Sequence, residues 1–304
     1  MEIEWNDNDW KLLTTYIRNK ACTPFIGAGA CAGILPSGGA LAKQLGDEVS
    51  YPFSDPGSLP RVSQFYDMMK GRYSAHFNVM GTLKQAIDDY PPARVKRIHQ
   101  VLAELPFHTY TTTNYDDLLQ KALIRLRQQC EPQTLVCRWH DRNTPVVATI
   151  AEGTYSRPVV FHMHGDLNSV QSMVLTEDDY LQFLCSVVER ENLIPMNIVT
   201  AFRTSALMFV GYSLEDISLR VLFQRVASFM AGNDFTHVAV QYTKPPNASA
   251  KDIEALEKHF EYQRKRLKNV NIRLFWGDCD EFAETLWSHW QAAQAPPAPQ
   301  QRSA

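Results

Sequence analysis

The chain has 304 residues, which is enough for one large domain or two modest ones with most of the apolar surface buried. Hydrophobic residues make up 45% of it and charged residues 21%, as is ordinary for a globular protein. The formal net charge of -3 gives no global field toward nucleic acid or anionic lipid, so we expect no direct binding to either. No apolar run approaches the roughly 20 residues of a membrane span, and residues 1–20 do not form a signal peptide. We therefore expect a cytoplasmic protein.

The cysteine pattern gives no sign of a metal site. None of the six cysteines belongs to a C-x-x-C pair. The closest spacings, Cys22 with Cys31 and Cys130 with Cys137, are too loose for a zinc knuckle. Free, mostly buried thiols in a reducing cytoplasm are the favoured interpretation, and we expect no bound metal.

Short apolar runs alternate with amphipathic stretches along the chain. The runs are typical of parallel strands that are buried on both faces, and they cover residues 23–26, 108–112, 159–163, 206–210, 237–240 and 271–275. Helical patterns lie between them, at residues 9–19, 114–128, 177–189, 214–230, 251–267 and 280–292. This alternation predicts an α/β fold with a Rossmann-like, doubly wound parallel sheet.

Two segments depart from this alternation. Residues 57–105 contain no convincing strand and are interpreted as a helical insertion with helices at 62–70 and 93–105, the second begun by Pro91-Pro92. The end of the chain is rich in proline and polar residues, which cannot form a packed core. We therefore expect one domain over residues 1–292 and a disordered tail over 293–304.

A glycine-rich turn follows the first predicted strand, at Gly27-Ala28-Gly29-Ala30. Glycines at such a turn let the backbone approach a pyrophosphate, whose charge is met by N–H groups at the start of a helix. A tight turn without any ligand is the alternative, because G-x-G alone is a weak signal.

Polar residues follow the second predicted strand, where open α/β sheets bind ligands. Asn114 and Asp116 stand close together there, after Thr112 and Thr113, and suit the recognition of sugar hydroxyls. Thr113 or Asn114 acting only as the cap of the next helix is the alternative.

The third predicted strand ends in His162-Met163-His164-Gly165. Alternation along a strand places His162 and His164 on the same face, so either could enter a cleft. Gly165 suggests that something approaches the backbone beside His164. Histidine is the natural general base near neutral pH, and a hydrogen-bonded structural histidine is the alternative.

The fourth signal is Gly211-Tyr212-Ser213, after another predicted strand. Gly211 and Ser213 would place small groups beside a phosphate or ribose at a helix start. Ser213 with Asp216 also fits a variant of the capping box, and the two interpretations are compatible. Thr176 with residues 177–179 is interpreted as a capping-box variant alone. The four signals follow successive strand ends and converge on one cleft.

This ordered set resembles the sirtuin superfamily, specifically the sirtuin-like domains of bacterial antiphage defence. The resemblance covers roughly Pro24 to Glu284. It is carried by G-A-G at Gly27 to Gly29, T-x-N-x-D at Thr112, Asn114 and Asp116, H-G at His164-Gly165, and G-x-S at Gly211 to Ser213.

The departures from the family pattern concern the substrate. Protein deacylases of the superfamily carry a zinc ribbon of two C-x-x-C pairs, which this sequence lacks. They also carry a G-I-P-D-F-R loop, where residues 33–39 here are G-I-L-P-S-G-G. Both departures argue against acyl-lysine substrates and match the defence-associated branch, whose members resemble hydrolases that deplete host NAD.

The resemblance implies hydrolysis of NAD to nicotinamide and ADP-ribose during abortive infection, through an oxocarbenium-like transition state. It implies His164 as the base or a ribose-hydroxyl partner, Asn114 as the group that positions ribose or water, and Asp116 as the group that orients the site or stabilises charge. The residues that it implies in NAD binding are Gly27, Ala28, Gly29, Ala30, Thr112, Gly165, Gly211 and Ser213.

Other outcomes remain open from the sequence. An NAD or ADP-ribose sensor or regulatory subunit without turnover would carry the same motifs, and a deacylase is the least favoured alternative. The preference for NAD or NADP, and hydrolysis against cyclisation, stay undecided. By resemblance we expect a homo-oligomer, in complex with a HerA-type ring ATPase or an Argonaute-like protein, with the insertion at 57–105 as an assembly or lid element.

Overall fold

The fold was analysed in a computed structural model, which describes residues 5–91, 93–141, 151–190, 193–212, 235–241, 258, 261–262, 265 and 271–294. Its strands form one seven-stranded sheet in the order β3-β4-β2-β1-β5-β6-β7, and every pairing is parallel. The strands are β1 (Cys22–Ile26), β2 (Thr109–Thr112), β3 (Gln133–Val136), β4 (Val159–His162), β5 (Ala206–Val210), β6 (His237–Gln241) and β7 (Ile272–Trp276). The predicted α/β fold with a doubly wound parallel sheet is confirmed.

Strand β1 lies at the centre of the sheet and sets the position of any ligand site. It pairs with β2 on one side and with β5 on the other, so the order of the strands reverses there. Every residue of β1 and β5 is buried, which explains their mostly apolar sequence. Open α/β sheets bind ligands at the carboxyl ends of the strands beside such a switch point.

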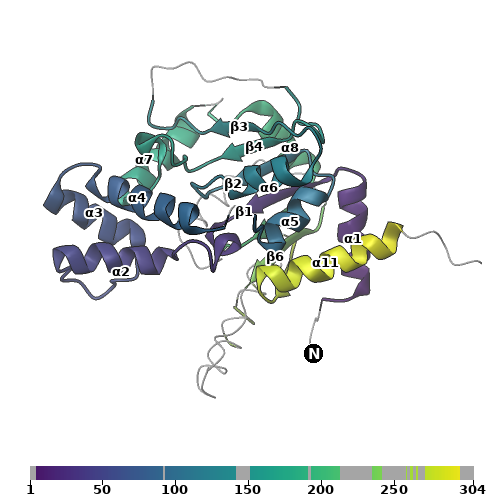
Figure 1. Ribbon diagram of the computed structural model, residues 1–304, viewed down its shortest axis with the longest axis horizontal. Coiled ribbons are helices and arrows are strands. Elements are labelled where there is room, and N and C mark those ends of the chain that lie inside the picture. Colours follow the sequence, from purple (N-terminus) through teal and green to yellow (C-terminus); the bar gives the residue numbers. More distant parts are fainter. Residues whose placement is uncertain are drawn as a thin grey trace, which may run out of the picture.

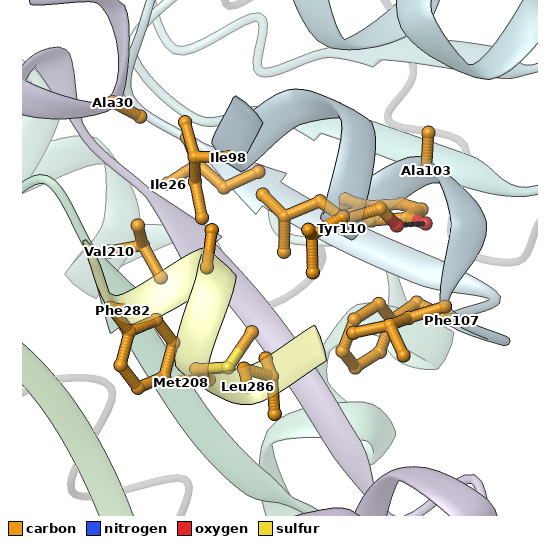
Figure 2. Close-up of a cluster of buried hydrophobic side chains, with 14 of the residues drawn as sticks. Ile26, Ala30, Ile98, Ala103, Phe107, Tyr110, Met208, Val210, Phe282 and Leu286 are labelled. Atoms are coloured by element: carbon orange, nitrogen blue, oxygen red, sulfur yellow. Dashed lines mark hydrogen bonds between the residues drawn. The ribbon is translucent and has the colours of Figure 1, made fainter. Parts of the chain in front are cut away.

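Helices cover both faces of the sheet. One face is covered by α1 (Asp7–Arg18), α5 (Arg97–Glu104), α6 (Leu118–Leu126) and α11 (Cys279–Gln294), as seen in Figure 1. The side chains that the sheet, α5 and α11 contribute to this core include Ile26, Met208, Val210, Ile98, Phe282 and Leu286 (Figure 2). The other face packs against α7 (Glu177–Glu189) and α8 (Met196–Thr204).

A third cluster lies beside the sheet, where Figure 1 shows α2 (Gly38–Val49), α3 (Leu59–Lys70) and α4 (Ser74–Asp89) grouped together. The described residues of the stretch 57–105 form helices and no strand, as expected, but these helices pack in different places. Helices α3 and α4 join α2 in this cluster, whereas α5 packs with α6 and α11 in the main layer. Helix α5 begins at Arg97 rather than 93, because the backbone is still extended at Lys96.

Several other boundaries differ from the sequence predictions. Helix α6 begins at Leu118 rather than 114, and α11 extends to Gln294. Strand β3 and helices α2, α4 and α8 were not predicted. The predicted helix at 214–230 and most of the one at 251–267 lie outside the described residues, as do residues 295–304 of the expected tail. The one-domain division over 1–292 stays a prediction.

The start of α7 connects the cluster of α2, α3 and α4 to the helices that cover the sheet. The predicted capping box is present, with Thr176 and Asp179 bonded to each other's backbone N–H groups. The three acidic residues of its first turn also reach α3 and α4. These contacts are Arg61 Nε to Glu177 Oε1 at 3.1 Å, Gln64 Nε2 to Asp178 Oδ2 at 3.0 Å, and His76 Nε2 to Asp179 Oδ2 at 2.9 Å.

The contact between His76 and Asp179 makes the stability of the fold depend on pH. Burial alone would lower the pKa of His76, but hydrogen bonds and charge from Asp179 and Asp67 outweigh it and raise the pKa from 6.5 to about 9. A raised pKa means that the folded protein holds this proton more tightly than the unfolded chain does. The stabilisation is therefore complete below pH 6.5 and is lost as the pH rises through about 9.

We expect the free energy of unfolding of the wild type to fall relative to that of His76→Gln as the pH rises from 6.5 to about 9. Urea denaturation across this range measures the difference between the two proteins. A difference that stays constant with pH would show that His76 does not hold the extra proton.

Among the described residues, no helix combines the length and apolar character that crossing a membrane requires.

Candidate active site

The ends of β1, β2, β4 and β5 are tied together by backbone hydrogen bonds. They run from Gly27 N to Val210 O at 2.8 Å, Gly29 N to Gly211 O at 2.8 Å, Thr113 N to Ile26 O at 3.1 Å and Met163 N to Thr112 O at 2.8 Å. The four predicted segments therefore meet at one edge of the sheet, and the cleft expected there stays a prediction. Of their residues, only Ser213 lies outside the described part of the chain.

Close contact between two backbones explains the glycines of the first turn. A Cβ atom on Gly27 would lie 2.7 Å from Gly211 O, and one on Gly29 would lie 2.9 Å from Gly211 Cα. Gly211 itself has a φ of 76°, and a Cβ there would lie 2.2 Å from Ala30 N. These glycines are required by chain packing whether or not a phosphate binds.

The turn leads into a short 3-10 helix, η1 (Ala28–Cys31), and not directly into an α-helix. Three N–H groups of the turn already have backbone partners, since Gly27 donates to Val210 O, Gly29 to Gly211 O and Ala30 to Gly27 O. Ala28 and Gly29 are the exposed residues of the turn. They are the part of the turn that a ligand can reach.

Asn114 is held by the glycine turn and does not cap a helix. Its backbone N–H donates to Thr112 Oγ1 at 2.9 Å, and its side-chain Nδ2 donates to Gly27 O at 3.1 Å and to Cys31 Sγ at 3.3 Å. Helix α6 begins four residues later, and its N-cap is Asp117. The alternative that Thr113 or Asn114 caps this helix is therefore wrong.

Asp116 points inward, and both of its carboxylate oxygens accept hydrogen bonds. Oδ1 accepts from the N–H of Leu118 at 3.1 Å, and Oδ2 accepts from the Cys31 thiol at 3.3 Å. Asp116 is buried, so its negative charge acts at close range on its surroundings.

His162 and His164 lie on opposite faces of the sheet, and the prediction that they share a face is wrong. Strand β4 ends at His162, so the alternation of side chains does not continue to His164. His162 lies beside α6, where Nδ1 donates to Asn114 O at 2.9 Å and Nε2 accepts from Gln120 at 2.7 Å. It is therefore a hydrogen-bonded structural histidine.

His164 packs against α7 instead. Its ring lies edge-on to Tyr180 and Phe183, with centroids 5.5 Å and 5.0 Å away. Burial lowers its pKa to about 3, so the ring is neutral at physiological pH. Within the described part of the chain, its buried Nε2 has no hydrogen-bond partner. A buried ring nitrogen without a partner is costly, and it leaves this atom able to accept a hydrogen bond from a ligand.

The chain itself approaches Gly165. This glycine has a φ of 89°, and a Cβ there would lie 2.1 Å from Ser172 O. Beside it, Val174 N donates to His164 O at 2.9 Å. The segment from Ser172 to Val174 thus covers the backbone of the H-G pair, and only glycine fits beneath it.

Sequence reasoning missed three residues that contact the predicted ones. Tyr212 donates its hydroxyl to Ile26 O at 3.1 Å, accepts from Thr113 Oγ1 at 2.8 Å, and its ring lies against Gly27. Cys31 contacts Asn114 and Asp116, and His99 of α5 lies behind Cys31. The position of Tyr212 inside G-x-S was a usable signal, but nothing in the sequence links His99 to the site.

All six cysteines are free, and only Cys185 is exposed. Among the described residues, no group of three or more histidine, cysteine or acidic side chains is arranged to hold a metal ion.

Comparison with known proteins gives the class to which this fold and site belong. The model of the family described as "SIR2-like domain" matches residues 108–275, which hold the T-x-N-x-D, H-G and G-x-S segments. The chain belongs to the SIR2-like domain family.

The chain is similar in sequence to several proteins named NAD(+) hydrolase ThsA. The chain is 26% identical over 220 residues to the protein of Cytobacillus dafuensis, covering 70% of this chain and 39% of the relative. It is 25% identical over 259 residues to that of Bacillus cereus (strain MSX-D12), covering 84% and 49%. The match to the protein of Enterococcus faecium is 27% over 222 residues, covering 71% and 42%. The chain thus spans less than half the length of these curated relatives.

We expect the ring signals of His164 not to titrate between about pH 5 and pH 8 in NMR spectra, because burial lowers its pKa to about 3. In Tyr180→Ala the ring becomes more accessible, and its pKa should move toward the ordinary 6.5. A wild-type titration midpoint close to 6.5 would contradict the buried placement of this ring.

Proposed function

We propose that this chain hydrolyses NAD to nicotinamide and ADP-ribose. The observation that carries the proposal is the meeting of Asn114 and the His164-Gly165 pair at neighbouring strand ends, beside the glycine turn after β1. The relatives named NAD(+) hydrolase ThsA support the choice of substrate and reaction.

The proposed reaction needs few groups. The bond between the ribose C1 and the nicotinamide nitrogen breaks, and its electron pair leaves with nicotinamide. A water oxygen then bonds to C1, and the proton that this water loses passes to a base or to solvent. The positive charge that develops on the ribose is typical of glycosidic cleavage.

Each proposed residue fits one of these needs. The Asp116 carboxylate is buried and fixed by two hydrogen bonds, so it can stabilise positive charge without reorganising. The Asn114 carboxamide positions the ribose or the attacking water. His164 is uncharged, and in its present surroundings it is better suited to accept a hydrogen bond from a ribose hydroxyl than to act as a strong base.

The proposed contacts to NAD follow the same edge. Ala28 and Gly29 are the exposed part of the turn and would face the pyrophosphate, with Gly27 and Ala30 shaping it. Thr112 supports Asn114 through its hydroxyl, and Gly165 and Gly211 allow the close backbone packing around the site. Ser213 remains a proposed contact.

His164 is covered by Tyr180 and Phe183, and this bears on regulation. A substrate can reach its ring only when α7 shifts, so we assign the described arrangement to a resting form. An NAD hydrolase without such a restraint would exhaust its own cell. The covered His164 also favours the second candidate function, a sensor that binds NAD or ADP-ribose without turnover.

The biological setting that we propose is depletion of NAD in antiphage defence, by abortive infection. The proposed assembly is a homo-oligomer, with a HerA-type ring ATPase or an Argonaute-like protein as the partner that releases the restraint. These proposals rest on the resemblance to defence-associated relatives.

Incubation of the purified protein with NAD, with nicotinamide quantified by chromatography, tests the reaction. We expect Asn114→Ala and His164→Ala to lower kcat by about 100-fold or more, because each removes a group that acts on the reacting ribose or water. His108→Ala is the matched control, since it alters the opposite end of the sheet, just before β2, and should leave kcat unchanged.

The outcomes separate the candidate functions. Parent-level release by His164→Ala or Asn114→Ala would contradict the assignment of these residues. ADP-ribose binding by calorimetry, together with no nicotinamide release in any assembly state, would favour the sensor.

A further inference from the structure

A buried network centred on sulfur lies directly behind the two polar residues after β2. Cys31, the last residue of η1, has its Sγ 3.3 Å from Asp116 Oδ2 and 3.3 Å from Asn114 Nδ2. His99 of α5 places its Nε2 3.9 Å from the same sulfur. Cys31 and His99 are 1% and 2% exposed, so no solvent competes for these contacts.

We propose that Cys31, backed by His99, is a positioning residue that fixes Asn114 and Asp116 for the reaction. This inference rests on the proposed function. Cys31 does not touch the substrate in this proposal and acts only through Asn114 and Asp116.

The thiol has the right number of hydrogen-bonding groups for this role. Burial, together with the charge and hydrogen bond of Asp116, raises the pKa of Cys31 well above its ordinary 9.0. The side chain therefore stays a thiol, with one S–H to donate and a sulfur that can accept. It donates to Asp116 and accepts from Asn114, which joins a carboxylate to a carboxamide through one atom.

This arrangement determines how Asn114 is oriented. Its amide nitrogen is engaged by Gly27 O and Cys31 Sγ, so the carboxamide oxygen must point away from both. An oxygen in that direction can accept a hydrogen bond from a ribose hydroxyl or from the attacking water. Without Cys31, one of the two contacts that fix the amide plane is lost, and the carboxamide is free to rotate.

Helices α5 and α11 keep the sulfur in place. Burial lowers the pKa of His99, so a neutral ring stands behind Cys31. Three residues earlier, Lys96 Nζ donates to Ala32 O at 2.5 Å and lies 3.4 Å from Asp280 Oδ2 of α11. Asp280 Oδ1 in turn accepts from Ile98 N at 3.2 Å. The loop after the glycine turn is thus fastened to elements remote from it in sequence.

The test compares Cys31→Ala with Cys31→Ser. Serine keeps a donor and an acceptor at this position, whereas alanine keeps neither. We expect Cys31→Ala to lower kcat for nicotinamide release by about 10-fold to 100-fold, because a small misplacement of a positioned group costs that much. KM should change little, and Cys31→Ser should recover most of the lost rate.

Cys137→Ala is the matched control. Cys137 is as buried as Cys31 but belongs to the core on the other face of the sheet. Both alanine variants should lose a similar amount of thermal stability, and only Cys31→Ala should lose kcat. Equal kcat in wild type and Cys31→Ala, or a Cys31→Ser variant as slow as Cys31→Ala, would overturn the proposal.

A second measurement keeps this proposal separate from the proposed function. The side-chain amide signals of Asn114 in NMR spectra, assigned by their loss in Asn114→Asp, report its two hydrogen bonds directly. We expect these signals to shift and to exchange faster in Cys31→Ala and to be largely retained in Cys31→Ser. If the wild type releases no nicotinamide, the proposed function fails, and unchanged Asn114 signals in Cys31→Ala would then overturn the positioning role as well.

Discussion

The close approach of two glycine-containing turns, one after β1 and one after β5, determines the arrangement of the candidate site. Gly27 and Gly29 after β1 lie against Gly211 after β5, at distances that leave no room for a Cβ atom. This contact brings the loops on either side of the switch point together. Asn114 then bonds to Gly27 O, and Tyr212 fills the space beside Gly27. The edge where we propose that NAD binds is therefore shaped by packing between the loops that follow these strands.

The fold was largely predictable because its central strands are buried on both faces. The apolar runs of β1 and β5 identify them directly, since every residue is covered. Strand β3 was not predicted because it lies at the edge of the sheet and none of its residues is fully buried. The early start expected for α6 was wrong because Asn114 bonds to the glycine turn and the helix begins only after its N-cap, Asp117.

Sequence patterns predicted which strand ends meet at the candidate site but not the contacts within it. The glycine turn, T-x-N-x-D and H-G follow strand ends, and parallel strands bring their carboxyl ends to one edge. The prediction that His164 shares a face with His162 was wrong because strand β4 ends at His162, two residues before His164. The contacts of Cys31 and His99 could not be predicted, since they join η1 to a helix that packs beside it only after folding.

The central claim is that NAD chemistry takes place at the carboxyl edge formed by β1, β2, β4 and β5. Titration of the labelled protein with ADP-ribose, followed by backbone amide NMR, tests this most directly. The account predicts the largest shifts at Ala28, Gly29, Asn114 and Gly165, with little change at Cys22 and Thr109, which begin β1 and β2 at the opposite edge. Saturable shifts confined to that opposite edge, or no shifts at saturating ADP-ribose, would contradict it.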